Sequence, residues 1–153
     1  AFTDKQKRKL MQAPKFWFFD VGVANHLLHR SQLVRGTIEY GHAFEHLVIQ
    51  ELIAYIGYHY HSHRLTYWRT YTGLEVDAVI TDASGQPVLA IEIKSVLEVQ
   101  RKHLKGLHAF HADYPDCQLM CVSLDKLARQ SDGVCLLHIH EFLQQLWNEQ
   151  LFS

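Results

Sequence analysis

The sequence has few cysteines, no long apolar run and no excess of either charge. Its three cysteines, Cys117, Cys121 and Cys135, lack the spacing of a zinc site, and an odd number argues against a disulfide framework. A reducing compartment fits this pattern, so we expect a cytoplasmic protein. No run of about 20 apolar residues occurs, so neither a membrane span nor a secretory signal is predicted. The net charge of −1 gives no general support for nucleic-acid binding.

What is present is typical of a single globular domain. The 153 residues suffice for one hydrophobic core, with 48% hydrophobic and 20% charged residues. No internal repeat, low-complexity tract or linker divides the chain. We expect residues 1–13 to be a polar lead-in that ends a missing upstream domain, and residues 14–153 to form one domain.

Hydrophobic periodicity and turn residues predict a series of helices and strands. An aromatic segment at 16–19 and a short helix at 21–30 precede a longer helix from about Tyr40 to Ile56, which Gly57 is expected to end. The remaining predictions are strands within 59–71, 74–81 and 87–94, a helix at 98–112, strands at 118–124 and 134–139, and a closing helix at 141–151. This order, with helix, three strands, helix and strand at its centre, predicts an α/β fold whose mixed central sheet is flanked by helices.

A turn at Ser84-Gly85 predicts two carboxylates facing each other. Antiparallel pairing from this turn sets Asp77 across from Glu92, and Glu75 across from Lys94, all on one face. The other face is apolar and carries Val76, Ala78, Ile91 and Ile93. Facing carboxylates destabilise a sheet unless a proton, a cation or a metal compensates them, and such oxygen ligands suit Mg²⁺ or Mn²⁺. The alternative is a solvated strand face with an incidental Glu75–Lys94 ion pair.

A third carboxylate lies on the long predicted helix. A helical wheel places Glu45 at the centre of the apolar stripe, with Leu52 and Ile56 about 20° to either side. An unpaired buried carboxylate is costly, so Glu45 needs a partner where the helix meets the sheet. We therefore expect it to join Asp77 and Glu92. The alternative is a place in the first helical turn, still in water and favoured by the helix dipole.

Four spaced motifs together resemble one known type of domain. They are K-F-W-F-F-D-V-G (15–22), G-x-x-F-E-x-x-V-x-x-E-L (41–52), Y-W-R-T-x-x-G-x-E-V-D (67–77) and I-E-I-K-S (91–95). The combination is similar to the nuclease-like C-terminal domain of a large group of prokaryotic P-loop ATPases, a domain of formally unassigned function. The likeness runs from about residue 14 to the end. It implies the restriction-endonuclease-like fold, with an αβββαβ core, and a PD-(D/E)XK site.

The resemblance also implies roles for particular residues. Asp77, Glu92 and Lys94 match the Asp, Asp/Glu and Lys positions of the motif, and Glu45 matches the helix Glu that many such nucleases add. Asp77, Glu92, Glu45 and the Ile93 carbonyl would hold Mg²⁺ or Mn²⁺, while Lys94 would orient water. The ATPase motif G-x-x-x-x-G-K-[ST] is absent, so ATP hydrolysis is not assigned to this chain.

The function implied is metal-dependent phosphodiester hydrolysis of nucleic acid, with DNA preferred to RNA. The domain would be attached to an upstream ATPase domain and would have no membrane partner. The alternative function is a catalytically silent module of the same fold that recognises DNA or protein. Metal binding would distinguish the two functions, because only the nuclease requires it.

Two further groups of residues each allow two interpretations. The basic residues within 101–105 fit either phosphate contacts or a solvated helix face. His59, His61 and His63 alternate, so on a strand they would share one face, where they could bind Zn²⁺ or remain exposed.

Overall fold

The computed structural model describes residues 10–11, 22, 33–59 and 62–151. Strands within these residues form one seven-stranded sheet in the order β1-β2-β3-β4-β5-β7-β6. The strands are β1 (Leu10–Met11), β2 (Arg64–Arg69), β3 (Glu75–Thr81), β4 (Pro87–Lys94), β5 (Gln118–Ser123), β6 (Arg129–Ser131) and β7 (Val134–His138). The helices are α2 (Ile38–His59), the 3₁₀ helix η1 (Arg101–Leu104), α3 (Lys105–His111) and α4 (Ile139–Trp147).

The sheet is mixed. β4, β5 and β7 run parallel, and the remaining neighbours pair antiparallel. The central order is α2, the three strands β2 to β4, then α3 and β5. This confirms the predicted α/β class and the helix–three strands–helix–strand series. None of the helices in the described part of the chain is long and apolar enough to cross a membrane.

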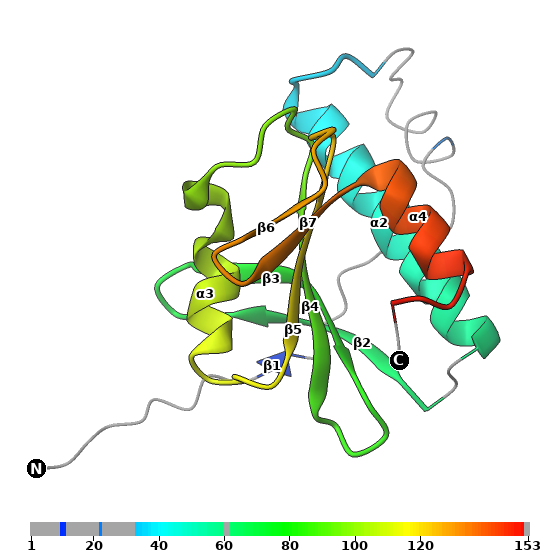
Figure 1. Cartoon of the computed structure of the whole chain (residues 1–153), viewed down its shortest axis with the longest axis vertical. Helices are drawn as coiled ribbons and strands as arrows, with labels where there is room; N and C mark the ends of the chain where they lie inside the picture. The colour runs from blue at the N-terminus through cyan, green and yellow to red at the C-terminus, as the bar shows by residue number, and fades with distance from the viewer. Residues whose placement is uncertain (1–9, 12–21, 23–32, 60–61, 152–153) are drawn as a thin grey trace, which may run out of the picture.

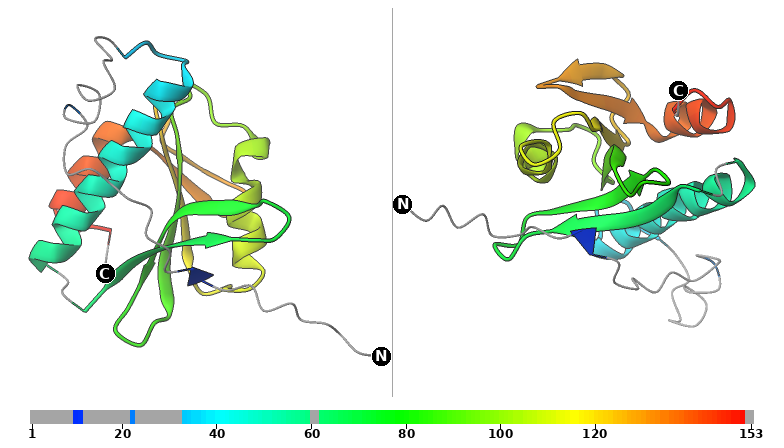
Figure 2. Two further views of the ribbon diagram at one scale, coloured as in Figure 1. Left: turned by 180° about the vertical axis from the view of Figure 1, so that it is seen from behind. Right: turned by 90° about the horizontal axis from the view of Figure 1, so that it is seen from below.

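Helices cover both faces of the sheet, as Figures 1 and 2 show. On one face, Ile80 and Ile91 share a buried cluster with residues of α2 and with Phe142 of α4. On the other face, Leu107 and Phe110 of α3 belong to a second buried cluster. β3 beyond its first residue and most of β4 are therefore buried on both sides, so the buried carboxylates Asp77 and Glu92 must find partners inside the protein.

Helix α2 is longer than the predicted 40–56 helix. Gly57, expected to end it, lies inside it, and a Cβ at this position would meet nothing within 4 Å. His59 is the last residue of α2, so the prediction that His59, His61 and His63 share a strand face is wrong. His61 itself lies outside the described residues.

The second half of the chain departs from prediction at element ends. The predicted 98–112 helix begins later, because the backbone N–H of Val99 donates to the Asp125 carboxylate (3.0 Å) and holds the preceding loop. The closing helix begins earlier, at Ile139, where the His138 side chain caps it. Strand β6 was not predicted; its three residues are too few to show a periodicity.

Some predictions concern segments that the structure does not describe. The segment 16–19 and the boundary between residues 13 and 14 lie outside the described residues. Of the predicted 21–30 helix, only Gly22 is described. These predictions, and the division into a lead-in and a single domain, stay predictions.

Candidate active site

Away from its turn, the β3–β4 hairpin pairs in the predicted register, whereas a register shift between Ile80 and Thr81 sets Thr81 across from Pro87 beside the turn. The turn is held by the Asp82 carboxylate, which accepts two backbone N–H groups within it. Ala78 pairs with Ile91, and one step further this register sets Asp77 across from Glu92. Strand pairing ends at Ala78 and Ile91 although both strands continue. The two strands therefore separate beside the two carboxylates.

A β-bulge in β3 lies at the same place. Two β3 residues, Asp77 and Ala78, lie across from the single β2 residue Tyr67, because the register shifts between Thr66 and Trp68. A bulge bends its strand and re-aims a side chain, and bulges are frequent beside active sites. Here the bulge directs Asp77 into the opening between β3 and β4.

Because of the bulge, the side chains of β3 are distributed between the two faces of the sheet differently from the prediction. Val76, expected on the same face as Ala78, instead belongs to the buried cluster beneath α3, whereas Ala78 lies in the cluster beneath α2. Glu75, adjacent to Val76, is exposed and lies 4.0 Å from Arg69. The alternative of a Glu75–Lys94 ion pair is therefore not the arrangement observed.

The buried Asp77 carboxylate bridges the two separating strands. Its Oδ2 accepts a hydrogen bond from the backbone N–H of Ile93 (2.8 Å) and lies 3.3 Å from Nζ of Lys94. The side chain thus replaces the strand-to-strand hydrogen bond that β4 loses where the pairing ends. This fixes the carboxylate at the end of β4.

The ammonium group of Lys94 lies between the two acids. Its Nζ is 2.5 Å from Oε1 of Glu92 and 3.3 Å from Oδ2 of Asp77. Burial alone would lower the pKa of Lys94, but the two carboxylates outweigh it and raise this pKa above its usual value. Lys94 is therefore charged across the physiological pH range and compensates the acids.

Glu92 is the least satisfied member of the site. Its Oε2 is buried and has no hydrogen-bond partner. Burial, and then the negative charge of Asp77, raise the pKa of Glu92 from 4.5 to about 8, although Lys94 opposes the shift. One oxygen of Glu92 is thus available for a proton or a cation.

Glu45 lies on the stripe of α2 that faces the sheet, as the helical wheel predicts. One turn earlier, a Cβ at Gly41 would lie 3.5 Å from Oγ of Ser95, which follows the end of β4. Glu45 is partly buried. Among the described residues, however, no group of three or more His, Cys, Asp or Glu side chains is placed to hold a metal ion. The structure thus brings together Asp77, Glu92 and Lys94, and the role of Glu45 as a third acid stays a prediction.

The donor set fits Mg²⁺. This ion prefers oxygen ligands and is commonly held by one or two carboxylates, with water and substrate phosphates completing the shell. Asp77 and Glu92 supply two carboxylates, and the unpartnered Oε2 of Glu92 is a free donor. Ile93 reaches the site through its N–H, and its carbonyl as a ligand stays a prediction, like that of Glu45.

Gly106 of α3 was not predicted to belong to the site. A Cβ at this position would collide with the carbonyl oxygen of Glu75 and would lie 3.6 Å from Oε2 of Glu92. Glycine therefore permits α3 to pack closely against the acids. An isolated glycine in a helical pattern is the sequence signal of such an approach.

The sequence matches one known protein family. Residues 40–142 match the family described as "Domain of unknown function (DUF4143)". The chain belongs to this family. The part that matches DUF4143 contains Glu45, Asp77, Glu92 and Lys94. Searches of curated proteins and of solved structures found no match. The description of DUF4143 assigns no activity.

Proposed function

We propose that this DUF4143 domain is a metal-dependent nuclease of the PD-(D/E)XK type that hydrolyses phosphodiester bonds in DNA and works attached to an ATPase domain. The observation that carries the proposal is the convergence of Asp77 and Glu92 on Lys94 where β3 and β4 separate. The unpartnered Oε2 of Glu92 supports a metal, because a buried polar atom without a partner is costly unless a ligand satisfies it.

Each residue has a role in this mechanism. When bound, Mg²⁺ or Mn²⁺ supplies positive charge to the phosphate and acidifies a water molecule. Asp77 and Glu92 would hold the ion, and Asp77 is kept in place by the hydrogen bond that the backbone N–H of Ile93 donates to it. With the ion compensating the two acids, Lys94 would be able to donate hydrogen bonds to the attacking water or to the phosphate. Glu45 would be a further carboxylate toward the ion.

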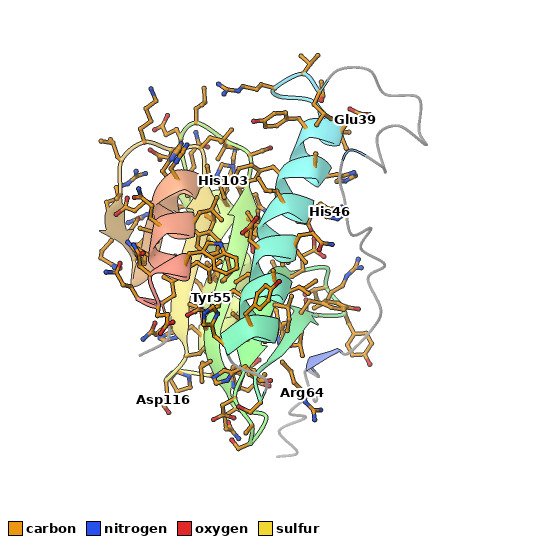
Figure 3. The ribbon with its side chains drawn as sticks, turned by 90° about the vertical axis from the view of Figure 1, so that its right-hand side faces the viewer. Glu39, His46, Tyr55, Arg64, His103 and Asp116 are labelled. Carbon is orange, nitrogen blue, oxygen red and sulfur yellow. The ribbon has the colours of Figure 1, made fainter. Side chains whose placement is uncertain are left out.

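Mutation tests the assignment directly. Asp77→Asn and Lys94→Ala should each lower the cleavage of plasmid and single-stranded DNA in Mn²⁺ by about 100-fold. The control is Asp116→Asn, which removes an exposed carboxylate at the end of the molecule away from η1 (Figure 3) and should cleave like the wild type. Circular dichroism should show all three variants folded. Full activity in Asp77→Asn would overturn the proposal.

A second function has its own support. Within the described residues no third acid joins Asp77 and Glu92 in a group placed to hold a metal, and this, with the net charge of −1, favours a silent module that recognises DNA or protein. Calorimetry with Mg²⁺ and Mn²⁺ separates the two functions. The nuclease should bind either ion at millimolar concentration or below, and Asp77→Asn should not. Absence of binding in the wild-type domain would favour the silent module.

A further inference from the structure

The 3₁₀ helix η1 carries His103 toward the site formed by Asp77, Glu92 and Lys94. Gly106 packs against Oε2 of Glu92, and α3 runs antiparallel to β4 because it joins the parallel strands β4 and β5. Three residues of helix span roughly 4.5 to 6 Å, close to the roughly 6.6 Å between Glu92 and Lys94 along the strand. His103, three residues before Gly106, therefore lies level with Lys94.

Two further observations agree with this position. The charge of Lys94 is among the causes that lower the pKa of His103, after burial and the charge of Lys102. Figure 3 shows His103 toward the end of the molecule where α2 begins with Glu39. The end of β4 reaches the same region, because Gly41 of α2 approaches Ser95.

A hydrogen bond determines which nitrogen of His103 can donate. Nδ1 accepts the backbone N–H of Gln100 (3.0 Å). The proton of the neutral ring must therefore be on Nε2. No partner of Nε2 is found among the described residues, and the side chain is only partly buried. His103 thus offers one oriented N–H donor beside the site.

We propose that His103 binds the nucleic-acid substrate by donating this Nε2–H hydrogen bond to a non-bridging phosphate oxygen at the scissile position. The inference rests on the proposed nuclease function. Phosphate oxygens are strong acceptors, and a donor of fixed orientation positions the phosphate without adding charge. The exposed Lys102, adjacent in the chain, supplies the cationic contact that a neutral imidazole lacks.

Three variants separate the donor from the structural role of the ring. His103→Gln can accept from Gln100 and also donate, His103→Glu can accept but not donate, and His103→Ala can do neither. If the donor matters, His103→Gln should keep kcat/KM for a DNA oligonucleotide within about threefold of wild type, and His103→Glu should lose about tenfold. His111→Glu adds the same charge at the exposed end of α3 and controls for repulsion.

Binding supplies an independent readout. In fluorescence anisotropy with a labelled DNA duplex and Ca²⁺, His103→Ala should weaken binding without changing the slope of log K against log salt. Lys102→Ala should reduce this slope by about 0.9. A changed slope in His103→Ala would overturn the neutral-donor role.

The outcomes also separate this inference from the proposed function. If the wild type cleaves DNA while His103→Gln and His103→Glu are equally active, His103 only caps η1 and the inference fails alone. If the wild type neither cleaves nor binds DNA, the nuclease proposal and the inference fail together.

Discussion

The carboxyl group of Glu92 is buried beside the charge of Asp77, and this determines its titration. Its pKa is raised from 4.5 to about 8. We expect ¹³C NMR of the side-chain carboxyl to show a midpoint near 8 in the metal-free protein, moving to lower pH when Mg²⁺ binds, because a bound cation favours the ionised form. A midpoint near 4.5 would mean that water reaches the carboxylate.

The same shift predicts how stability depends on pH. Between pH 4.5 and about 8, folded Glu92 keeps a proton that the unfolded chain has lost, so its contribution to the free energy of unfolding falls as the pH rises. Glu92→Gln removes this contribution. We measure the free energy of unfolding by urea at pH 5 and at pH 9. The decrease in this free energy between the two pH values should be about 2 kcal/mol smaller for the variant than for the wild type. An equal fall in both proteins would contradict this prediction.

At the scale of single residues, the turn and the alternation of side chains predicted which residues lie across from each other in most of the β3–β4 pair. The predicted register is found from Ile80 to Ala78 and sets Asp77 across from Glu92, but the register shift between Ile80 and Thr81, beside the turn, was not predicted. The bulge at Asp77 was not predicted, because the alternation of side chains in β3 does not show that the pairing of β2 with β3 shifts by one residue at Tyr67. Whether Glu45 approaches the acids depends on the packing of α2 on the sheet, which the helical wheel cannot specify.

At the scale of elements, two glycines in helices differ in the space around them. Gly106 allows α3 to approach the backbone of Glu75, whereas Gly57 in α2 faces open space. Gly106→Ala should lower the free energy of unfolding by about 3 kcal/mol, because α3 must move away from the sheet. Gly57→Ala should raise it by about 0.5–1 kcal/mol, because alanine is the better helix former. Urea titrations measure both, and similar values for the two variants would contradict the close approach at Gly106.

Asp125 joins two loops, the one that follows β4 and the one that follows β5. Its buried carboxylate accepts the backbone N–H of Val99 (3.0 Å) and of Leu127 (3.1 Å) and pairs with Arg129 (2.9 Å). Burial opposes ionisation, but these donors outweigh it and lower the pKa of Asp125. The carboxylate thus fixes the loop after β4 to the loop after β5.

Removing this carboxylate should be costly. Asp125→Ala leaves the buried N–H of Val99 unsatisfied and should lower the free energy of unfolding by about 3 kcal/mol. The control is Arg101→Ala, which breaks an exposed ion pair with Asp132 and should cost less than about 0.5 kcal/mol. Because the loop after β4 leads to η1, Asp125→Ala should also increase amide exchange in η1. Unchanged exchange there would show that the loop is held in other ways.

The sequence predicted the ends of helices and strands less accurately than their presence. The 98–112 helix was predicted from periodicity, but Asp125, distant in sequence, holds Val99 outside the helix. The His59 segment was predicted as strand from its β-favouring residues, yet it ends α2. There His59 stacks on Tyr55 within the helix (4.7 Å) and also meets the edge of Trp147 of α4 (6.1 Å), a tertiary contact that supports helix over the local strand propensity.

For the whole molecule, metal binding and folding must be linked if the site is a metal centre. A ligand that binds only the folded state at 100 times its Kd stabilises that state by about 2.7 kcal/mol, which for a chain of this length corresponds to roughly 5–10 °C in Tm. Calorimetric melting with Mg²⁺ at 100 times its measured Kd should show such an increase. Asp77→Asn should show none, whereas Asp116→Asn should behave like the wild type.

The pH dependence of this stabilisation connects the site to the fold. Binding of the cation requires ionised Glu92, whose pKa in the metal-free protein is raised to about 8. Below that pH the ion must displace a proton, so the increase in Tm should be smaller at pH 6 than at pH 9. In Glu92→Gln the increase should be small at both values. A metal-dependent increase that is independent of pH and survives Asp77→Asn would place the ion elsewhere in the molecule, because only a site at the separation of β3 and β4 couples cation binding to the proton of Glu92.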